Sequence, residues 1–328
     1  MIGFGPVSTW FPEHTLRVAD LPELAELPSA RREHALSLGI DTVRCAQGAT
    51  ETELAEQAAR KALRRAGLDA AALDALLLVQ GRAPQYLLAS EATRLQQALG
   101  AERAFVAGVG ELGCVSVSAA FRLAAALLRG DPRCRTVLVA AAARTPTRAR
   151  YRSPMTVLGD GAAAVLLSSD GADSRYELVD ITVHSDGRYA DLFRIDYRDV
   201  PSDHWVEECA DEPTYSFRLA VESSKRFTAI NTEVLARNAL SPEDISAVLM
   251  QNLSAGALAF WSESLGQPIH PSCGENLARY GHLGSVDVLV NMDDAAATLA
   301  PGATALLLNS SPVAAWSTAV LRRTDVRV

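Results

Sequence analysis

Short apolar runs alternate with longer stretches of helical periodicity along the first half of the chain. Apolar runs of about four to eight residues that are bounded by turn residues are typical of buried strands. The pattern predicts strands over 73–80, 103–109 and 136–142, and helices over 52–66, 90–99 and 115–128. This alternation of strand and helix predicts an α/β fold built from βαβ units around a mostly parallel sheet.

The second half of the chain repeats the pattern of the first. Residues 66–80 resemble residues 238–251, and residues 113–130 resemble residues 281–298. The first similarity pairs residue 80 with residue 251, the second pairs 114 with 282, and the two separations differ by three residues. An ancient duplication explains two similarities in the same order better than chance resemblance between segments rich in alanine and leucine.

The second similarity brings two reactive side chains to equivalent positions. Cys114 and His282 each fall at the predicted start of a helix in their own half of the chain. If the halves pack about a pseudo-twofold axis, the two helix starts converge on one pocket. We therefore expect a thiol and an imidazole to meet in the folded protein.

The composition is that of a soluble globular protein, with 48% hydrophobic and 21% charged residues. No window holds eighteen uninterrupted apolar residues, and the N-terminus lacks the basic start and apolar run of a secretory signal. A net charge of −8 argues against nucleic-acid binding, which needs clustered basic residues. We expect a cytoplasmic protein without a membrane span or a nucleic-acid partner.

One of the five cysteines lies in a setting that favours reactivity. The set forms no CxxC pair and no metal-ligand spacing with histidine, so we expect free thiols and no metal site. Cys114, in the run GVGELGCVSVSA, follows a predicted strand and a glycine-rich turn at the first turn of a predicted helix. The positive end of a helix stabilises a thiolate, and the Cys114 N–H can donate to an oxyanion on an attached acyl group.

This segment resembles the nucleophile region of the β-ketoacyl-acyl-carrier-protein synthase III family, of the thiolase superfamily. The run LGDGAAAVLL over 158–167 and the run HSDGRYADL over 184–192 are similar to two further motifs of that family. The resemblance covers nearly the whole chain and implies a thiolase-like five-layered αβαβα fold of two duplicated halves, usually a homodimer. We expect one half over 1–170, with the nucleophile, and the other over 171–328, with its partners.

The departures from the family pattern point away from carbon–carbon bond formation. Condensing members carry a Cys-His-Asn set, whereas this chain has Gln251 at the His position and His282 at the Asn position. An amide cannot act as a base. His282 can do so, and Asp287, five residues on, can orient its imidazole or can be a solvated carboxylate. A Cys-His-Asp set resembles the non-condensing, acyl-transferring branch of the family.

Other positions bear on substrate binding. In the loop before Trp316, Ser311 or Pro312 falls near the position of the family's second oxyanion donor. Since proline has no N–H, either the donor shifts to Ser311 or Val313, or the oxyanion hole is built differently. Asn252 and His184 are candidate pocket residues, with a surface position equally open for His184. Glu33 and Ser37 replace the family's Trp and Arg clamp for coenzyme A, which favours a donor on a carrier protein. Candidate groups for the phosphopantetheine phosphate are Arg148, Arg150 and Arg152.

The resemblance therefore implies an acyltransferase of polyketide or antibiotic biosynthesis that needs no cofactor of its own. An acyl group on the phosphopantetheine of an acyl carrier protein, or on coenzyme A, passes to Cys114 and then to an acceptor hydroxyl, amine or carrier thiol. One alternative is a decarboxylative synthase in which Asn252 and His282 form the decarboxylation site. The others are a catalytically silent partner subunit of a synthase and a hydrolase that discharges acyl groups to water.

Overall fold

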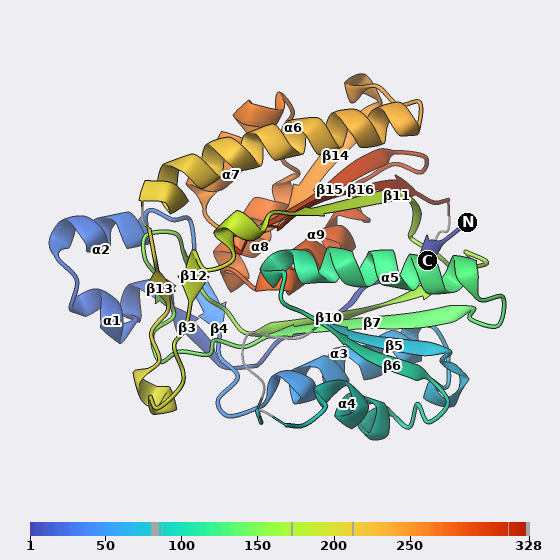
Figure 1. The fold of residues 1–328 in the computed structure, drawn as a ribbon, viewed down its shortest axis with the longest axis horizontal. Helices are drawn as coiled ribbons and strands as arrows, with labels where there is room; N and C mark the ends of the chain where they lie inside the picture. Colours follow the sequence, from blue (N-terminus) through green and yellow to red (C-terminus); the bar gives the residue numbers. More distant parts are fainter. Residues whose placement is uncertain (80–84, 87, 172, 212, 314, 326–328) are drawn as a thin grey trace.

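The computed structural model describes residues 1–325 except 80–84, 87, 172, 212 and 314. Its layers are stacked in the order helix, sheet, helix, sheet, helix (Figure 1). The α/β class and the expected five-layered αβαβα arrangement are confirmed. The predicted strand over 73–80 is present as Ala75–Val79, and residue 80 lies outside the described residues.

The strands of both sheet layers are joined in one ten-stranded hydrogen-bonded order, because the short β1 (Gly3–Phe4) pairs with a strand of each layer. The first layer consists of β2 (Ser8–Trp10), β10 (Gly161–Ser168), β7 (Thr136–Ala143), β5 (Ala75–Val79) and β6 (Phe105–Val109). The second layer consists of β14 (Ile245–Met250), β15 (Thr304–Ser311), β16 (Ala315–Arg323) and β11 (Tyr176–Ser185). Smaller pairs are β3 (Thr15–Arg17) with β4 (Thr42–Arg44), β8 (Tyr151–Arg152) with β9 (Thr156–Val157), and β12 (Phe193–Arg194) with β13 (Glu208–Cys209).

The expectation of a mostly parallel sheet is wrong. Among the described strands, β5 pairs in parallel with β6 and β7, and β14 pairs in parallel with β15. The pairs β7–β10, β1–β10, β1–β11, β11–β16 and β15–β16 are antiparallel. The alternation of strand and helix did not reveal these antiparallel pairs. Strands β15 and β16 form a hairpin, and β7 is connected to β10 without a crossover helix; both connections produce antiparallel neighbours.

The helices fill the remaining three layers. The first outer layer, beside β5 and β6, holds α3 (Glu51–Arg65) and α4 (Glu91–Leu99), and the second holds α6 (Leu219–Arg237) and α7 (Ala255–Leu265). The middle layer contains α5 (Ser116–Gly130) and α9 (Asp287–Ala295), and α8 (Pro271–Tyr280) packs against α9. Two short helices, α1 (Pro22–Ala25) and α2 (Ser29–Leu36), project from one end (Figure 1).

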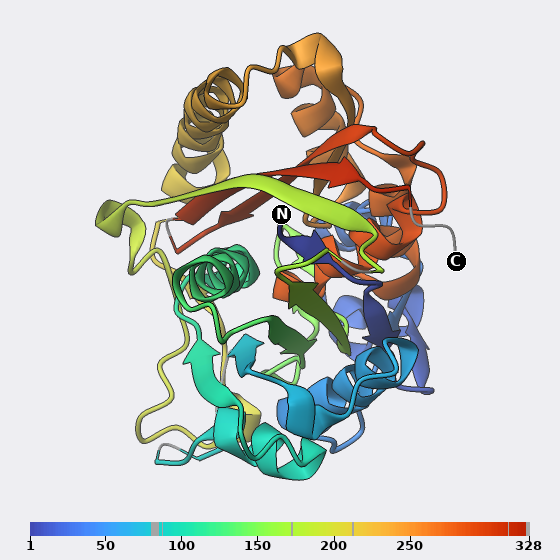
Figure 2. The same ribbon diagram turned by 90° about the vertical axis from the view of Figure 1, so that its right-hand side faces the viewer.

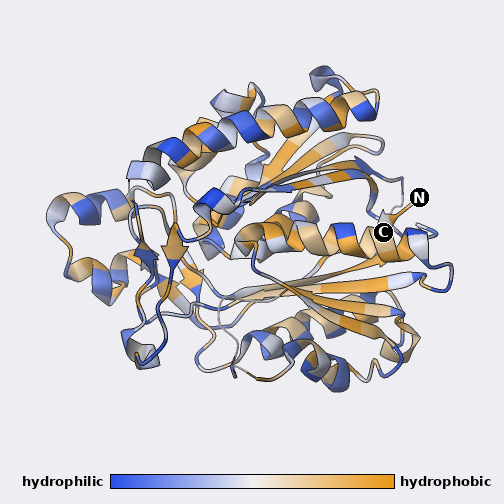
Figure 3. Cartoon of the chain, in the orientation of Figure 1, coloured by the Kyte–Doolittle hydropathy of each residue, from blue (hydrophilic) through white to orange (hydrophobic). Residues whose placement is uncertain are grey.

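Separate apolar clusters hold the layers together. Strands β5, β7 and β10 are buried on both faces and are correspondingly apolar along their whole length (Figure 3). Alternate residues of β5 enter different clusters: Leu77 packs on the middle layer, and Leu76 packs towards α3 and α4. Helix α3 begins at a capping box formed by Thr50 and Glu53, and its buried face carries Leu54 into the outer cluster.

The segment Gly113–Gly130 is long and apolar enough by composition to cross a membrane, and 56% of it is buried inside the protein. It contains α5, which lies between the two sheet layers and is seen nearly end-on in Figure 2. The core helix of a globular protein meets the same criteria of length and hydropathy. The apolar character of this segment therefore matches its position in the middle layer.

The expected boundary between the halves, at 170/171, lies in the connection between β10 and β11. Each half contributes one sheet layer, one outer helical layer and one helix of the middle layer. The division into two domains stays a prediction, since β1 of the first half is hydrogen-bonded to β11 of the second.

Candidate active site

Cys114 lies where the chain turns from β6 into α5. Two residues of the turn have left-handed backbones, Glu111 at φ 69° and Gly113 at φ 55°. The 3₁₀ turn η3 (Gly113–Val115) then leads directly into α5. Cys114 is buried, and the Ser116 hydroxyl steadies the turn by accepting a hydrogen bond from the Leu112 N–H at 3.2 Å. The thiol is therefore held at a helix start, as the sequence predicts.

His282 is placed by an irregular segment between α8 and α9. Its neighbour Gly281 has φ 65° and ψ −153°, a region in which side-chain-bearing residues are strained. A Cβ on Gly281 would also lie 2.5 Å from the Val157 carbonyl oxygen. The same carbonyl accepts the His282 N–H at 2.9 Å, and the Gly159 N–H donates to the His282 carbonyl at 3.2 Å. The backbone of His282 is thus fixed against the end of β9 and the segment that leads into β10.

The three predicted side chains meet in the interior. The Sγ atom of Cys114 lies 3.5 Å from Nε2 of His282. On the other edge of the ring, Nδ1 lies 2.6 Å from the Asp287 carboxylate. Asp287 is fully buried and also accepts the N–H groups of Leu283, at 2.8 Å, and Asn252, at 2.9 Å. It is therefore neither a solvated nor a merely capping carboxylate, because it orients the imidazole.

This environment favours a charged imidazole. Burial alone lowers the pKa of His282, but the Asp287 carboxylate and the Cys114 sulfur outweigh burial and raise the pKa to about 9. Because the folded-state pKa is raised, the stability contributed by the charged ring is complete below its ordinary pKa. That contribution is lost as the pH rises through about 9.

The internal repeat is real in structure, but its predicted register is wrong by three residues. The turn η3 has its counterpart in η8 (Gly284–Val286), which leads into α9. The glycines that open the two turns have φ 55° and φ 60° and are 171 residues apart, the same separation as residues 80 and 251. The counterpart of Cys114 is therefore Ser285, not His282. The two turns do converge, since the Ser285 hydroxyl donates to the Gly113 carbonyl at 3.0 Å.

Gln251 and Asn252 are buried near the candidate trio, and their side chains are engaged elsewhere. Gln251 accepts the Ser310 N–H at 3.1 Å and donates to the Ser310 carbonyl at 3.3 Å. The Asn252 amide exchanges hydrogen bonds with Asn291 at 2.8 and 3.3 Å. The Gln251 side chain thus holds the end of β15. The Asn252 side chain is held by Asn291, while its backbone N–H donates to Asp287.

The end of β15 lies against the Cys114 turn. The side-chain N–H of Asn309 donates to the Cys114 carbonyl at 3.0 Å. Two residues on, and on the same face of the strand, Ser311 is buried next to Gly113. Ser311 is among the residues predicted from the sequence, whereas Asn309 and Ser285 are not. The internal repeat, in its correct register, points to Ser285.

His184 does not join this group. It pairs with Trp316 across β11 and β16, and the Trp316 indole N–H donates to Ser223 of α6. The next residue of β16, Ser317, faces the opposite way and bonds Ser118 of α5. Because cross-strand partners share a face, His184 lies on the α6 side of the sheet, away from Cys114.

Two of the three arginines expected to bind a phosphate are committed elsewhere. Arg150 is nearly buried and forms an ion pair with Asp160 at 2.9 Å, and it also donates to the Thr145 hydroxyl and the Leu158 carbonyl. Arg152 is 8% exposed and pairs with Glu207 at 2.7 Å. These contacts disfavour Arg150 and Arg152 as phosphate ligands, and Arg148 is the exposed member of the set. The assignment of these arginines to a phosphate stays a prediction.

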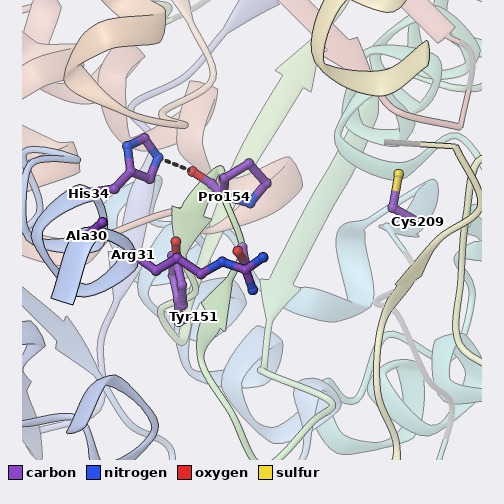
Figure 4. A pocket seen from close by; sticks show the side chains of 7 residues that line it. Ala30, Arg31, His34, Tyr151, Pro154 and Cys209 are labelled. Carbon is purple, nitrogen blue, oxygen red and sulfur yellow. Dashed lines mark hydrogen bonds between the residues drawn. The ribbon is translucent and has the colours of Figure 1, made fainter. Parts of the chain in front are cut away.

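A surface cavity of about 490 Å³ lies between α2 and the Tyr151–Pro154 segment. Figure 4 shows Arg31 and His34 on one side and Cys209 across from them, with His34 bonded to the Pro154 carbonyl. Cys209 pairs with Phe193, whose ring packs edge-on against Tyr215. Burial raises the pKa of Tyr215. Tyr215, a residue absent from the sequence-based candidates, is thus connected to the cavity through Phe193 and Cys209.

Glu33 and Ser37, at the positions of the family's coenzyme A clamp, are exposed on and just after α2. Within the described part of the chain, no group of three or more histidine, cysteine or acidic side chains is arranged to hold a metal ion.

Family models and curated relatives match a large part of the chain. The family model of 3-oxoacyl-[acyl-carrier-protein] synthase III matches residues 111–187, and the model of its C-terminal part matches residues 235–323, together about half of the chain. β-Ketoacyl-[acyl-carrier-protein] synthase III of Rubrobacter xylanophilus is 28% identical over 78% of both chains. The protein of the same name from Oleidesulfovibrio alaskensis is 29% identical over 84% of this chain and 86% of its own.

Solved structures show the same fold. ChlB3, described as an acyltransferase, superimposes with a TM-score of 0.85 at 24% identity over 98% of both chains. 3-Oxoacyl-[acyl-carrier-protein] synthase III of Aquifex aeolicus gives a TM-score of 0.81 at 20% identity, covering 98% of this chain and all of that one. AbyA1, a tetronic acid condensing enzyme, gives 0.80 at 23% identity.

Replacing Arg150 tests its structural role. Arg150→Ala leaves the Asp160 carboxylate buried without its cation, which costs on the order of 3–5 kcal/mol. We expect a large drop in the urea midpoint of unfolding. The exposed Arg148→Ala is the matched control and should change stability by no more than about 0.5 kcal/mol. Equal midpoints for the two variants would contradict the ion-pair assignment.

Replacing Asp287 tests the coupling between the three side chains. Asp287→Asn keeps the shape but removes the charge that raises the pKa of His282, so the imidazolium beside Cys114 forms less readily. The pH profile of Cys114 alkylation by iodoacetamide should move to higher pH by about one unit or more. An unchanged profile, or a move to lower pH, would show that Asp287 does not control the pair.

Proposed function

Because this chain belongs to the 3-oxoacyl-[acyl-carrier-protein] synthase III-like family of thiolase-fold proteins, we propose that it is an acyltransferase working through Cys114. In this proposal the thiol takes an acyl group from the thioester of an acyl carrier protein or coenzyme A. The group then passes to an acceptor hydroxyl, amine or carrier thiol of a natural-product pathway in the cytoplasm. The main support is the buried chain of contacts from Cys114 through His282 to Asp287.

The first half-reaction starts from the Cys114 thiolate and the His282 imidazolium. The Cys114 thiolate attacks the donor carbonyl, and the tetrahedral oxyanion collapses with loss of the carrier thiolate. Imidazolium at His282 Nε2 gives its proton to that leaving sulfur. Asp287 stays ionised throughout and holds the proton on Nδ1, so that Nε2 faces the reacting atoms.

The second half-reaction starts from acyl-Cys114 and neutral His282. Nε2 accepts the proton of the acceptor O–H, N–H or S–H while the acceptor atom attacks the thioester carbonyl. Collapse of the second tetrahedral oxyanion releases the acylated acceptor and returns a thiolate beside an imidazolium. One base therefore serves both steps, and no cofactor is required.

The engagement of Gln251 and Asn252 supports transfer over condensation. A decarboxylative condensation must stabilise an enolate in addition to the acyl-enzyme, which needs further donors aimed into the site. The side-chain amide of Gln251 is bonded to Ser310, and that of Asn252 is bonded to Asn291. Neither amide is directed at Cys114.

A decarboxylative synthase is the second candidate, favoured by the shared name of the curated relatives. The silent-subunit alternative is less favoured, because a thiol, an imidazole and a carboxylate in hydrogen-bond sequence have no evident purpose in a subunit that only supports another.

We propose that the donor's pantetheine arm enters through the cavity beside α2, which Cys209 lines and to which Tyr215 is connected through Phe193. Exposed Arg31 lines this cavity, and exposed Arg148 is the remaining candidate for the phosphate. The exposed α2 offers no aromatic clamp for an adenine ring, which favours a carrier-bound donor.

We also propose that the protein is a homodimer. Strand β6 ends the sheet order, with β5 as its partner within the described residues, and its Phe105 is 58% exposed. An edge strand has unpaired backbone groups and, with an exposed aromatic residue, tends to pair with another chain. A second copy, added along β6, would cover it.

Intact-mass spectrometry tests the proposed function. After incubation with acetyl, butyryl and benzoyl thioesters of pantetheine, carrier-bound and free, we expect one acyl mass on the protein. The adduct should be absent in Cys114→Ala and should disappear when a hydroxyl, amine or thiol acceptor is added, with the acyl group recovered on the acceptor. An adduct that persists in Cys114→Ala, or none with any donor, would refute the proposal.

A further inference from the structure

An acyl group on Cys114 needs hydrogen-bond donors for its carbonyl oxygen. During transfer that oxygen carries a negative charge in a buried site, where each well-placed donor has a large effect on rate. The backbone N–H of Cys114, at the helix start, is one candidate. A second donor has to come from a segment that lies against the same turn, and the end of β15 is such a segment.

Three other donors of this segment are already used. The Ser310 N–H is bonded to Gln251 at 3.1 Å, and Pro312 has no N–H. The Val313 N–H is bonded to the Ser311 hydroxyl oxygen at 3.3 Å. The Asn309 amide donates to the Cys114 carbonyl at 3.0 Å. The shift of the oxyanion donor to the Val313 N–H, one of the sequence-based expectations, is therefore disfavoured.

The Ser311 hydroxyl is well placed to donate. Ser311 is 3% exposed, and its Oγ would lie only 2.4 Å from a Cβ on Gly113, so it packs directly on the residue before Cys114. Since its oxygen accepts from Val313, its proton is turned to another side. Among the described residues, no acceptor is recorded for that proton. The Gln251 clamp on Ser310 holds the neighbouring backbone and therefore the direction of the hydroxyl.

We propose that the Ser311 hydroxyl is the second oxyanion donor of this site, a side chain in the place of a backbone N–H; the proposal rests on the proposed acyl transfer. When the Cys114 sulfur bonds to the donor carbonyl carbon, the π electron pair moves to oxygen, and Ser311 donates a hydrogen bond to it. The pair returns as the carrier thiolate leaves with the proton of His282. Ser311 keeps its own proton throughout.

This role separates two reactions of the same thiol. Acylation passes through an oxyanion, whereas alkylation by iodoacetamide is a displacement at a saturated carbon and forms none. Ser311→Ala should therefore slow acylation of Cys114 by about 10²–10³-fold in kcat, with little change in KM. The rate of alkylation by iodoacetamide should stay within about twofold of the wild type, because Cys114 and His282 are untouched.

The experiment measures single-turnover acylation with pantetheine thioesters, alkylation and melting temperature side by side. Ser310→Ala, which removes a neighbouring hydroxyl bonded to Gln251, is the matched control and should retain most of the acylation rate. The proposal would be overturned if Cys114 in Ser311→Ala were acylated at the wild-type rate. It would also be overturned if the rates of acylation and alkylation fell in parallel. If the wild type itself acquires no acyl group on Cys114, the proposed function fails as well, and the two failures are distinguished in one series.

Discussion

In the proposed function, the hydrogen bond between His282 and Asp287 is the interaction on which the chemistry of the site depends. A carboxylate that is fully buried is costly unless donors surround it. Here the donors are the imidazole at 2.6 Å and the N–H groups of Leu283 and Asn252. The same contacts fix the ring so that its other nitrogen faces Cys114. Burial of the acid and orientation of the base are therefore one structural feature.

Duplication supplies the frame for this feature. Two equivalent turns face each other across the middle layer, opened by Gly113 and Gly284 with the same left-handed backbone. One copy carries the thiol, and the other carries Ser285, which supports the first turn through its hydroxyl. The residue three positions after each glycine differs between the halves: it is Ser116 in one half and Asp287 in the other. Reactivity thus arises from the difference between two halves that share one backbone.

The helices of the first half were predicted from the sequence because they depend on local pattern. The five layers and the Cys-His-Asp set were expected from the family resemblance. Prediction from the sequence failed where long-range contacts decide. Strand direction was missed because it depends on how β7 reaches β10, which periodicity does not record. Arg150 looked like a surface cation, and only the fold shows Asp160 beside it. The face of His184 depends on the register of β11 with β16, and the commitment of Gln251 depends on β15 lying next to β14.

In the proposed function, Cys114 is acylated, and no carbon nucleophile is generated beside it. The most direct test follows the fate of preloaded acyl-Cys114 mixed with a malonyl-carrier protein and an alcohol or amine acceptor. We expect the acyl group to appear on the acceptor, with no carbon dioxide released. Release of carbon dioxide together with a 3-ketoacyl product would contradict the account and identify the protein as a condensing enzyme.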